Sequence, residues 1–341
     1  MNPGPVMLDV AGLELRPEEK DLLRHPATGG VILFSRNYEN KAQVTHLIRS
    51  LRAVRPELLV AVDHEGGGRV QRFRAEMTAL PAMGNVGALH ERDPVRAEQW
   101  ATDCGTVLAW ELAQLGIDFS FTPVLDLDYG RSAVIGNRSF HRQPTRVCSL
   151  AQALVQGLHG QGMRAVVKHF PGHGHVAVDS HIGLPVDERS WAELETADLI
   201  PFRALLDGAG VGALMPAHIL YPAIAPEPAG FSPFWLQTLL RQRWGFKGMI
   251  ISDDLAMGGA ISWGGGAEER THQALDAGCD AVLLCNDASA AEQALESLEK
   301  KIFSSLLAQR WMKMRGTSNV PLPQREREYH EAHRRLRDME G

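Results

Sequence analysis

The chain has 341 residues, which fits either two average domains or one barrel built from repeating β/α units. Hydrophobic residues make up 44% of the chain and charged residues 22%, a composition that excludes a wholly disordered or fibrous protein. The 41 acidic side chains outnumber the 35 Lys and Arg side chains, and the formal net charge of -6 argues against a nucleic-acid-binding protein.

The cysteines and the amino terminus indicate where the protein works. The four cysteines lie far apart and form no CxxC pair, which argues against a disulfide scaffold or a zinc ribbon. The amino terminus lacks a basic region followed by a long apolar stretch, and no window approaches ~18 uninterrupted apolar residues. We therefore expect a soluble, cytoplasmic monomer that binds neither a membrane nor a nucleic acid.

Short runs of β-branched residues or leucine alternate with segments of helical spacing, a pattern typical of β/α units around a parallel sheet. Eight runs are predicted as strands, at residues 6–11, 30–34, 58–62, 117–124, 165–168, 212–215, 249–252 and 281–284. Helices are predicted between them at residues 16–25, 41–54, 94–115, 145–161, 191–207, 233–244 and 267–277. Eight such units in a chain of this size predict a closed, TIM-like (β/α)8 barrel with long βα loops at its carboxyl face.

The domain count follows from the absence of a linker. No stretch rich in Pro, Ser or Gly divides the sequence, so we expect a single barrel domain over residues 1–341, with a charged helix from about residue 323. An open doubly wound sheet is the alternative, but the first predicted strand is not followed by GxGxxG and no phosphate-binding GxxxxGKS or GxxxxGKT occurs. The charged carboxyl tail is better explained as a solvated helix than as a nucleic-acid-binding arm.

Polar residues follow most of the predicted strands, where a barrel of this kind carries its catalytic side chains. Such a ring of polar groups is costly to bury unless it serves a polar ligand or a metal. We therefore predict a functional site at the carboxyl face, formed by Asp63, His64, Glu65, Asp126, Asp128, Lys168, His169, His218, Asp253 and Asp254.

The segment from Lys168 to Pro185 holds four histidines in a glycine-rich loop that is able to fold back over the barrel mouth. One interpretation is a metal site, because imidazole and carboxylate suit zinc or iron, although no HExxH occurs. Another is a structural loop in which His173 and His175 bond to backbone carbonyls. A third pairs Asp179 with His181, so that the carboxylate orients the imidazole and raises its basicity for proton transfer.

Such a pair requires a nucleophile across the barrel mouth. Asp253 suits this role because it directly follows the apolar run MIIS, which fixes it at a strand end. A cap on the following helix explains the same position equally well. Strand periodicity turns Asp254 to the other side, so we do not expect the two carboxylates to act as an adjacent pair.

Four sequence blocks contain these candidates: VDHEGGGRVQRF (62–73), IGNRSF (135–140), KHFPGHG followed by DSHIGLP (168–185), and SDDLAMGGA (252–260). They resemble the blocks of family 3 glycoside hydrolases, and more narrowly the bacterial cytoplasmic β-N-acetylhexosaminidases of peptidoglycan recycling. The blocks occur in the family's order, and the resemblance extends from Leu8 to about Asn286.

The resemblance implies a retaining exo-β-N-acetylglucosaminidase that needs no metal or cofactor. Its substrate would be a muropeptide, N-acetylglucosaminyl-1,6-anhydro-N-acetylmuramic acid with or without its peptide. Asp253 would be the nucleophile, and His181 the general acid/base with Asp179 as its partner. The terminal N-acetylglucosamine would be bound by Asp63, Arg72, Arg138, Lys168 and His169.

One block departs from the family pattern. The family usually reads EGGR, whereas here Glu65 is followed by three glycines before Arg69. The placement of Arg69 and Arg72 relative to Asp63 is therefore open.

Three other functions stay open at this point. A phosphorylase would act on the same β-N-acetylglucosaminides, since a histidine repels incoming phosphate less than a carboxylate does. A metal-dependent barrel hydrolase would use His169, His173, His175 and His181 as ligands. A non-catalytic sugar-binding protein is disfavoured because both Asp253 and the Asp179–His181 pair are present.

Overall fold

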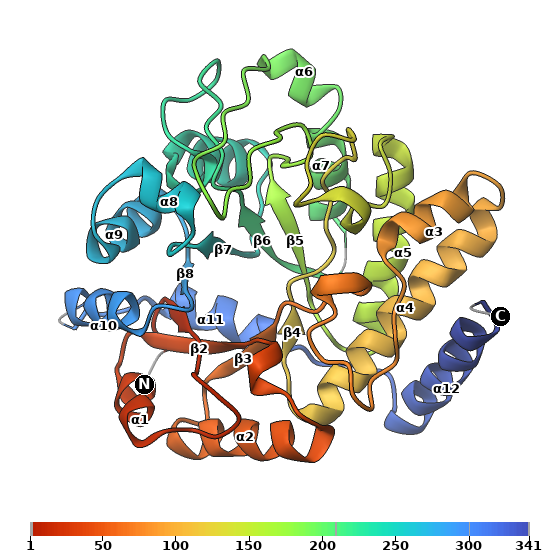
Figure 1. Cartoon of the computed structure of the whole chain (residues 1–341), viewed down its shortest axis with the longest axis horizontal. Helices are drawn as coiled ribbons and strands as arrows, with labels where there is room; N and C mark the ends of the chain where they lie inside the picture. The colour runs from red at the N-terminus through yellow and green to blue at the C-terminus, as the bar shows by residue number, and fades with distance from the viewer. Residues whose placement is uncertain (1–2, 209, 300, 340–341) are drawn as a thin grey trace.

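The computed structural model describes residues 3–208, 210–299 and 301–339, with the side chain of Arg69 excepted. These residues form a (β/α)8 barrel, as the alternation of strand and helix patterns predicts (Figure 1). The strands are β1 (Val6–Leu8), β2 (Thr28–Leu33), β3 (Leu59–Val62), β4 (Phe119–Ser120), β5 (Ala165–Phe170), β6 (Val211–Pro216), β7 (Met249–Asp254) and β8 (Ala281–Leu284). Their order in the sheet is β4-β3-β2-β1-β8-β7-β6-β5, and every paired neighbour is parallel.

The barrel closes between the two ends of this order, along the segment that follows β4. Val124 bridges to Lys168 in parallel, and the Leu125 amide donates to the Lys168 carbonyl at 2.7 Å. The Val166 amide also donates to the Thr122 carbonyl at 2.9 Å. Lys168 therefore lies at the seam that closes the barrel.

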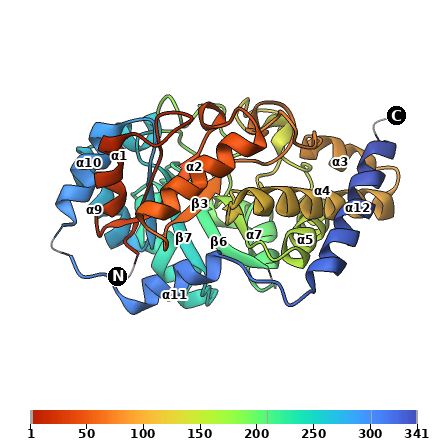
Figure 2. The same cartoon turned by 90° about the horizontal axis from the view of Figure 1, so that it is seen from below.

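The helices surround the sheet and include several short ones inside the βα loops (Figures 1 and 2). They are α1 (Pro17–Arg24), α2 (Lys41–Val54), α3 (Met83–His90), α4 (Pro94–Leu115), α5 (Pro144–Gly160), α6 (Trp191–Glu195), α7 (Leu199–Leu206), α8 (Gly258–Trp263), α9 (Ala267–Ala277), α10 (Ala288–Ser297), α11 (Ser305–Met314) and α12 (Leu322–Met339). The segment Phe234–Arg243 is a π-helix. None of the helices in the described ranges combines the length and apolar character needed to cross a bilayer.

Two predicted elements differ from the structure, and proline accounts for both. The strand predicted at 117–124 is paired in β4 only at Phe119–Ser120, because Pro123 has no N–H to continue the ladder. The helix predicted at 191–207 is divided into α6 and α7. Pro201 lacks the N–H that a continuous helix would direct to the carbonyl four residues earlier.

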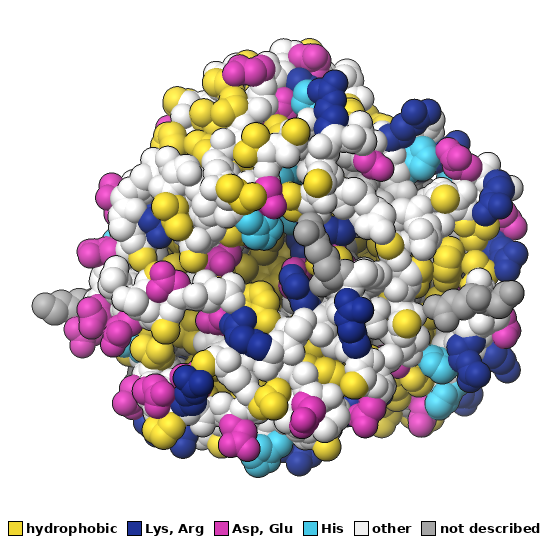
Figure 3. Space-filling view, in the orientation of Figure 1, with side chains coloured by type: hydrophobic (Ala, Val, Ile, Leu, Met, Phe, Trp, Pro, Cys, Tyr) yellow, Lys and Arg dark blue, Asp and Glu magenta, His cyan; other side chains and the backbone are white. Residues whose placement is uncertain are grey.

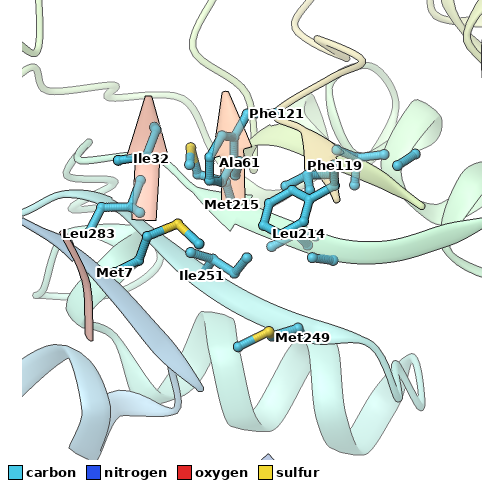
Figure 4. Packing of buried hydrophobic residues seen from close by; sticks show 14 of the residues in the cluster. Met7, Ile32, Ala61, Phe119, Phe121, Leu214, Met215, Met249, Ile251 and Leu283 are labelled. Atoms are coloured by element: carbon cyan, nitrogen blue, oxygen red, sulfur yellow. The ribbon is translucent and has the colours of Figure 1, made fainter. Parts of the chain in front are cut away.

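The barrel interior is filled by apolar side chains from successive strands. Met7 from β1, Ile32 from β2 and Ala61 from β3 converge with Phe119 and Leu283 in the view of Figure 4. All five residues are almost completely buried. The strands read as nearly continuous apolar runs because each has one face toward this interior and the other toward the helices.

The charged tail forms α12, which packs along α4 at the edge of the molecule (Figure 2). The Arg335 guanidinium donates two hydrogen bonds to the Asp103 carboxylate, at 2.8 and 2.6 Å. The Tyr329 ring stacks on Trp110 with the ring centroids 5.5 Å apart. The apolar residues of α12 that meet this surface, Ala332 and Leu336, are buried.

Glycines set the close approach of α4 to α5. A Cβ atom added at Gly105 would lie 2.2 Å from the Leu154 carbonyl oxygen, and one at Gly157 would lie 2.1 Å from the Thr102 carbonyl oxygen. Because both contacts are with helix backbone, no change of side-chain rotamer relieves them. The two helices therefore depend on glycine at both positions for their spacing.

We expect Gly157→Ala to lower the free energy of unfolding by about 1–3 kcal/mol, because the added methyl group forces α4 and α5 apart. Gly160→Ala is the matched control, since it lies on the same helix with no atom within 4 Å of an added Cβ. That variant should leave the stability unchanged or raise it by up to about 1 kcal/mol. Urea unfolding of both variants measures the difference, and equal midpoints would contradict the explanation.

Candidate active site

A cavity of about 300 Å³ opens at the carboxyl ends of the strands, within the size range of small-molecule sites. Figure 3 shows the molecule hollowed near its centre, with acidic, basic and histidine side chains around the hollow. The cavity brings together all the site residues that the resemblance implies: Asp63, Arg72, Arg138, Lys168, His169, Asp179, His181 and Asp253.

One side of the cavity is a cluster of paired charges around Lys168. This lysine is 2% exposed, and its Nζ atom lies 2.6 Å from Asp63 Oδ1 and 2.5 Å from Glu65 Oε1. Arg72 donates to the other Asp63 oxygen at 3.1 Å. Burial raises the pKa of the Asp63 carboxyl, but Lys168, Arg72 and Arg138 outweigh it and hold the pKa well below its usual range. Asp63 is therefore ionised at neutral pH.

Glu65 completes the cluster, although the sequence places it only at the barrel rim and indicates no role in binding. Arg138 donates to both of its carboxylate oxygens, at 2.9 and 2.7 Å. Burial lowers the pKa of Arg138, but the paired carboxylate of Glu65 raises it above its usual value. Glu65 thus joins the Arg138 guanidinium to the Lys168 ammonium and fixes the position of both.

The extra glycine after Glu65 does not remove Arg72 from the site. Gly66, Gly67 and Gly68 all have positive φ, at 105°, 66° and 42°, a region that favours glycine. The turn is closed by a hydrogen bond from the Glu65 amide to the Val70 carbonyl at 2.9 Å. The extra residue is absorbed in this turn, and the question of Arg72 is answered by its contact with Asp63. The side chain of Arg69 lies outside the described residues.

Asp126 follows β4 and binds two histidines, His169 and His173, that line the cavity. Its Oδ2 atom lies 2.7 Å from His169 Nδ1, and its Oδ1 atom accepts from the His173 amide at 2.7 Å. Burial raises the pKa of the Asp126 carboxyl, but the two histidines and their hydrogen bonds lower it overall. Asp126 is therefore a carboxylate that orients the His169 ring.

The four histidines of the loop have separate partners instead of converging on one point. His173 Nε2 lies 2.8 Å from Ser180 Oγ. Burial is the main cause that lowers the pKa of His173 to about 4, and the neighbouring His169 ring lowers it further. His175 Nε2 lies 2.9 Å from an Arg131 nitrogen. Within the described ranges, no three His, Cys, Asp or Glu side chains are arranged to hold a metal ion.

Asp179 and His181 form a hydrogen-bonded pair at the cavity rim. His181 Nδ1 and the His181 amide nitrogen both lie 2.8 Å from Asp179 Oδ1. Partial burial raises the pKa of the Asp179 carboxyl, but the two hydrogen bonds from His181 outweigh it and lower the pKa. With Nδ1 directed to the carboxylate, Nε2 is the ring nitrogen left to exchange a proton with a ligand.

Asp253 is the residue before the last in β7, and its Oδ1 atom accepts from the Asp254 amide at 2.8 Å. Burial raises the pKa of its carboxyl, but His218, His169 and His181 are close enough to lower it below its usual value. The alternative role as a helix cap is wrong, because α8 begins at Gly258 and Met257 is its cap residue. Asp253 is a half-buried carboxylate that lines the cavity.

Asp254 corrects a second expectation, since it lines the same cavity instead of facing away from it. The pairing of β7 with β8 is irregular between Ile251 and Asp254, so simple alternation fails at the strand end. Asp254 Oδ1 accepts from the amides of Ala256 and Cys285, both at 3.0 Å. Burial nevertheless raises the pKa of Asp254 to about 7. The two neighbouring carboxyls therefore differ in charge state near neutral pH.

Comparisons with known proteins show the family of this chain. The chain matches the glycosyl hydrolase family 3 N-terminal domain over residues 6–312. It is 52% identical over 320 residues to a β-hexosaminidase of Nitrosospira multiformis, covering 94% of this chain and 90% of that protein. A β-hexosaminidase of Neisseria meningitidis serogroup A is 52% identical over 316 residues, covering 92% of this chain and 86% of that protein.

Solved structures give the same result. NagZ from Neisseria gonorrhoeae in complex with N-trifluoroacetyl-D-glucosamine superposes with a TM-score of 0.89 at 46% identity, over 98% of this chain and 97% of that one. A family 3 β-N-acetylglucosaminidase from Paenibacillus sp. superposes with a TM-score of 0.81 at 30% identity, over 97% of this chain and 66% of that one. The barrel, its cavity and these relatives together place the chain in glycosyl hydrolase family 3, as a glycoside hydrolase.

Proposed function

We propose that this glycoside hydrolase is a retaining exo-β-N-acetylglucosaminidase. The observation that carries the proposal is that the half-buried carboxylate of Asp253 and the Asp179–His181 pair line one cavity. The relatives called β-hexosaminidase, and the NagZ structure with a bound glucosamine derivative, support the choice of an N-acetylated aminosugar.

The substrate we propose is a muropeptide, N-acetylglucosaminyl-1,6-anhydro-N-acetylmuramic acid with or without its peptide. The enzyme would remove the terminal non-reducing N-acetylglucosamine during cell-wall recycling in the cytoplasm, as a monomer. This part of the proposal rests on the sequence resemblance to the enzymes of peptidoglycan recycling.

The charged cluster is suited to bind the terminal sugar. Asp63 is an ionised carboxylate that accepts hydrogen bonds from sugar hydroxyls, while Arg138 and Lys168 donate to hydroxyl and carbonyl oxygens. Arg72 and His169 line the same cavity and add further donors. Because the charges pair with one another in the protein, the donors and acceptors are oriented before the sugar enters.

The reaction proceeds in two steps through a glycosyl ester on Asp253. In the first step, Asp253 forms a bond to the anomeric carbon through an oxocarbenium-like transition state, while His181 donates a proton to the leaving oxygen. In the second step, the now neutral His181 takes a proton from water, the water oxygen attacks the anomeric carbon, and the bond to Asp253 breaks. Two inversions leave the β configuration unchanged. Asp179 orients the imidazole through its hydrogen bond to Nδ1.

The decisive assay uses p-nitrophenyl N-acetyl-β-glucosaminide with and without phosphate and a chelator. We expect release of N-acetylglucosamine, β-configured when first formed by proton NMR, at a rate that neither addition changes. A sugar 1-phosphate as product would instead show a phosphorylase, and loss of activity on chelation would show a metal-dependent hydrolase. Binding without turnover would identify a sugar-binding protein.

The nucleophile is tested by covalent trapping. We expect Asp253→Asn to abolish labelling by a 2-fluoro or 5-fluoro glycosyl donor, because an amide is a poor nucleophile at the anomeric carbon. Asp254→Asn is the control, since it alters the neighbouring carboxyl that is held by backbone amides, and it should keep the label. Peptide mass spectrometry locates the ester, and a label on Asp254 or Glu65 would overturn the assignment.

The acid/base is tested by varying the leaving group. We expect His181→Ala to slow disaccharide cleavage by ~10²–10⁴-fold, because protonation of the leaving oxygen limits the first step. Activated aryl glycosides should still give a fast burst of phenol followed by slow turnover, which azide accelerates since it needs no deprotonation. Asp179→Asn should have a milder effect of the same kind. Equal slowing of both substrate classes, with no burst and no azide effect, would show that His181 only shapes the cavity.

The role of Glu65 is tested by removing its charge. We expect Glu65→Gln to raise KM and the Kd for N-acetylglucosamine by roughly 10- to 100-fold, the equivalent of one charged hydrogen bond at ~1.5–3 kcal/mol, because Arg138 and Lys168 lose their shared partner. Glu91→Gln is the control, since that carboxylate pairs with Arg146 at the surface. Calorimetric titration measures the Kd, and unchanged binding would assign Glu65 to stability alone.

A further inference from the structure

The loop that carries Asp179 and His181 is held down by backbone hydrogen bonds from α8. We name residues 171–188 the dyad loop. The Gly259 amide donates to the Ser180 carbonyl at 2.7 Å, and the Gly258 amide donates to the His181 carbonyl at 3.1 Å. Both glycines follow β7 by a few residues, in the same segment that carries Asp253.

The fit between the dyad loop and α8 leaves no room for side chains on the two glycines. A Cβ atom at Gly258 would lie 2.4 Å from the carbonyl carbon of Ile182 and 2.7 Å from the His181 oxygen. One at Gly259 would lie 3.1 Å from both the Ser180 oxygen and the His218 Cβ. The contact at Gly258 is impossible for any residue larger than glycine unless the loop moves, while that at Gly259 is tight.

Ser180 fixes the same part of the dyad loop through its buried side chain. It is 2% exposed, whereas the side chains of its neighbours Asp179 and His181 are 31% and 61% exposed. Its hydroxyl lies 2.8 Å from His173 Nε2, and the His173 amide in turn donates a hydrogen bond to the Asp126 carboxylate. Ser180 is therefore held at both its side chain and its carbonyl.

We propose that Gly258, Gly259 and Ser180 are positioning residues that hold the acid/base pair in place over the nucleophile. They form a seat for the dyad loop, defined as the Gly258 and Gly259 amides together with the Ser180–His173 contact. Because the Gly258 and Gly259 amides and Asp253 belong to one βα segment, closing the loop on these amides fixes His181 relative to the attacking carboxylate. This proposal rests on the proposed function, in which His181 transfers the proton.

The seat predicts which step of the reaction slows when the dyad loop is displaced. The sugar-binding cluster around Lys168 lies on the segment after β3, on β5 and on the loop before α5, and it shares none of the seat's contacts. Displacing the dyad loop should therefore slow proton transfer and leave sugar affinity unchanged. Substrates with poor leaving groups should suffer most, because only they need a proton in the first step.

The test compares three glycines by the space around them. We expect Gly258→Ala to lower kcat for a disaccharide by at least about 10-fold, part of the ~10²–10⁴-fold that a positioned acid/base supplies. Gly259→Ala should have a smaller effect, since its nearest contacts are longer. Gly183→Ala is the matched control on the dyad loop itself, where an added Cβ has no atom within 4 Å, and it should behave like the wild type. The Kd for N-acetylglucosamine should be the same in all three.

Ser180→Ala provides a test that adds no bulk. It removes the hydroxyl that binds His173 and should lower kcat for the disaccharide more than for an activated aryl glycoside. If Gly258→Ala does not fold, Gly259→Ala and Ser180→Ala carry the same comparison. Equal slowing of both substrates, or weaker binding of N-acetylglucosamine, would overturn the proposal and assign these residues to the shape of the cavity.

Hydrogen exchange separates this proposal from the proposed function. Amides of residues 177–183 should exchange faster in Gly258→Ala than in the wild type or in Gly183→Ala, whatever reaction the enzyme catalyses. Unchanged exchange would overturn the seat. A wild-type enzyme that fails to cleave N-acetylglucosaminides would overturn the proposed function, and the exchange result would still decide whether the glycines hold the loop.

Discussion

The buried ammonium of Lys168 is the constraint on which the rest of the site depends. A charge with 2% exposure is tolerated only when paired, and Lys168 is paired with two carboxylates from the segment after β3. Those carboxylates in turn bind Arg72 and Arg138, so that three chain segments meet in one cluster of charges. Removing either carboxylate would leave three cations with a single negative partner. The cluster is therefore a single unit, and its geometry exists before a sugar arrives.

Two carboxyls at the end of β7 have different pKa values because their surroundings differ. Asp253 and Asp254 are adjacent and both half-buried, but the nearby histidines and the Asp254 amide lower the pKa of Asp253, while desolvation raises the pKa of Asp254 to about 7. A nucleophile must be ionised, whereas a carboxyl that is partly protonated at neutral pH adds less repulsion beside it. The pair thus concentrates negative charge on the residue that we propose as the attacking group.

Much of this arrangement was predictable from the sequence, because a barrel places every strand end at one face. The apolar runs predicted the strands, and Asp63, Lys168 and Asp253 could be assigned to that face because each stands at the end of such a run. The failures have physical causes that a periodic pattern does not contain. Pro123 ended the pairing of β4, the irregular end of β7 turned Asp254 into the cavity, and the partners of Glu65 come from distant parts of the chain. The sugar-binding roles came from the family resemblance, whereas the nucleophile and the acid/base pair were also predicted from the residues themselves; all of these roles stay predictions.

Lys168 also has a second structural role, because its backbone closes the barrel against the segment after β4. Its carbonyl accepts from Leu125, and its amide donates to the Pro123 carbonyl at 3.2 Å. Occupancy of the sugar site and integrity of the seam are therefore thermodynamically linked through one residue. A ligand that binds only the closed barrel shifts the folding equilibrium by RT ln(1 + [L]/Kd). A higher ligand concentration therefore raises the folded fraction of the enzyme as well as the occupancy of its site.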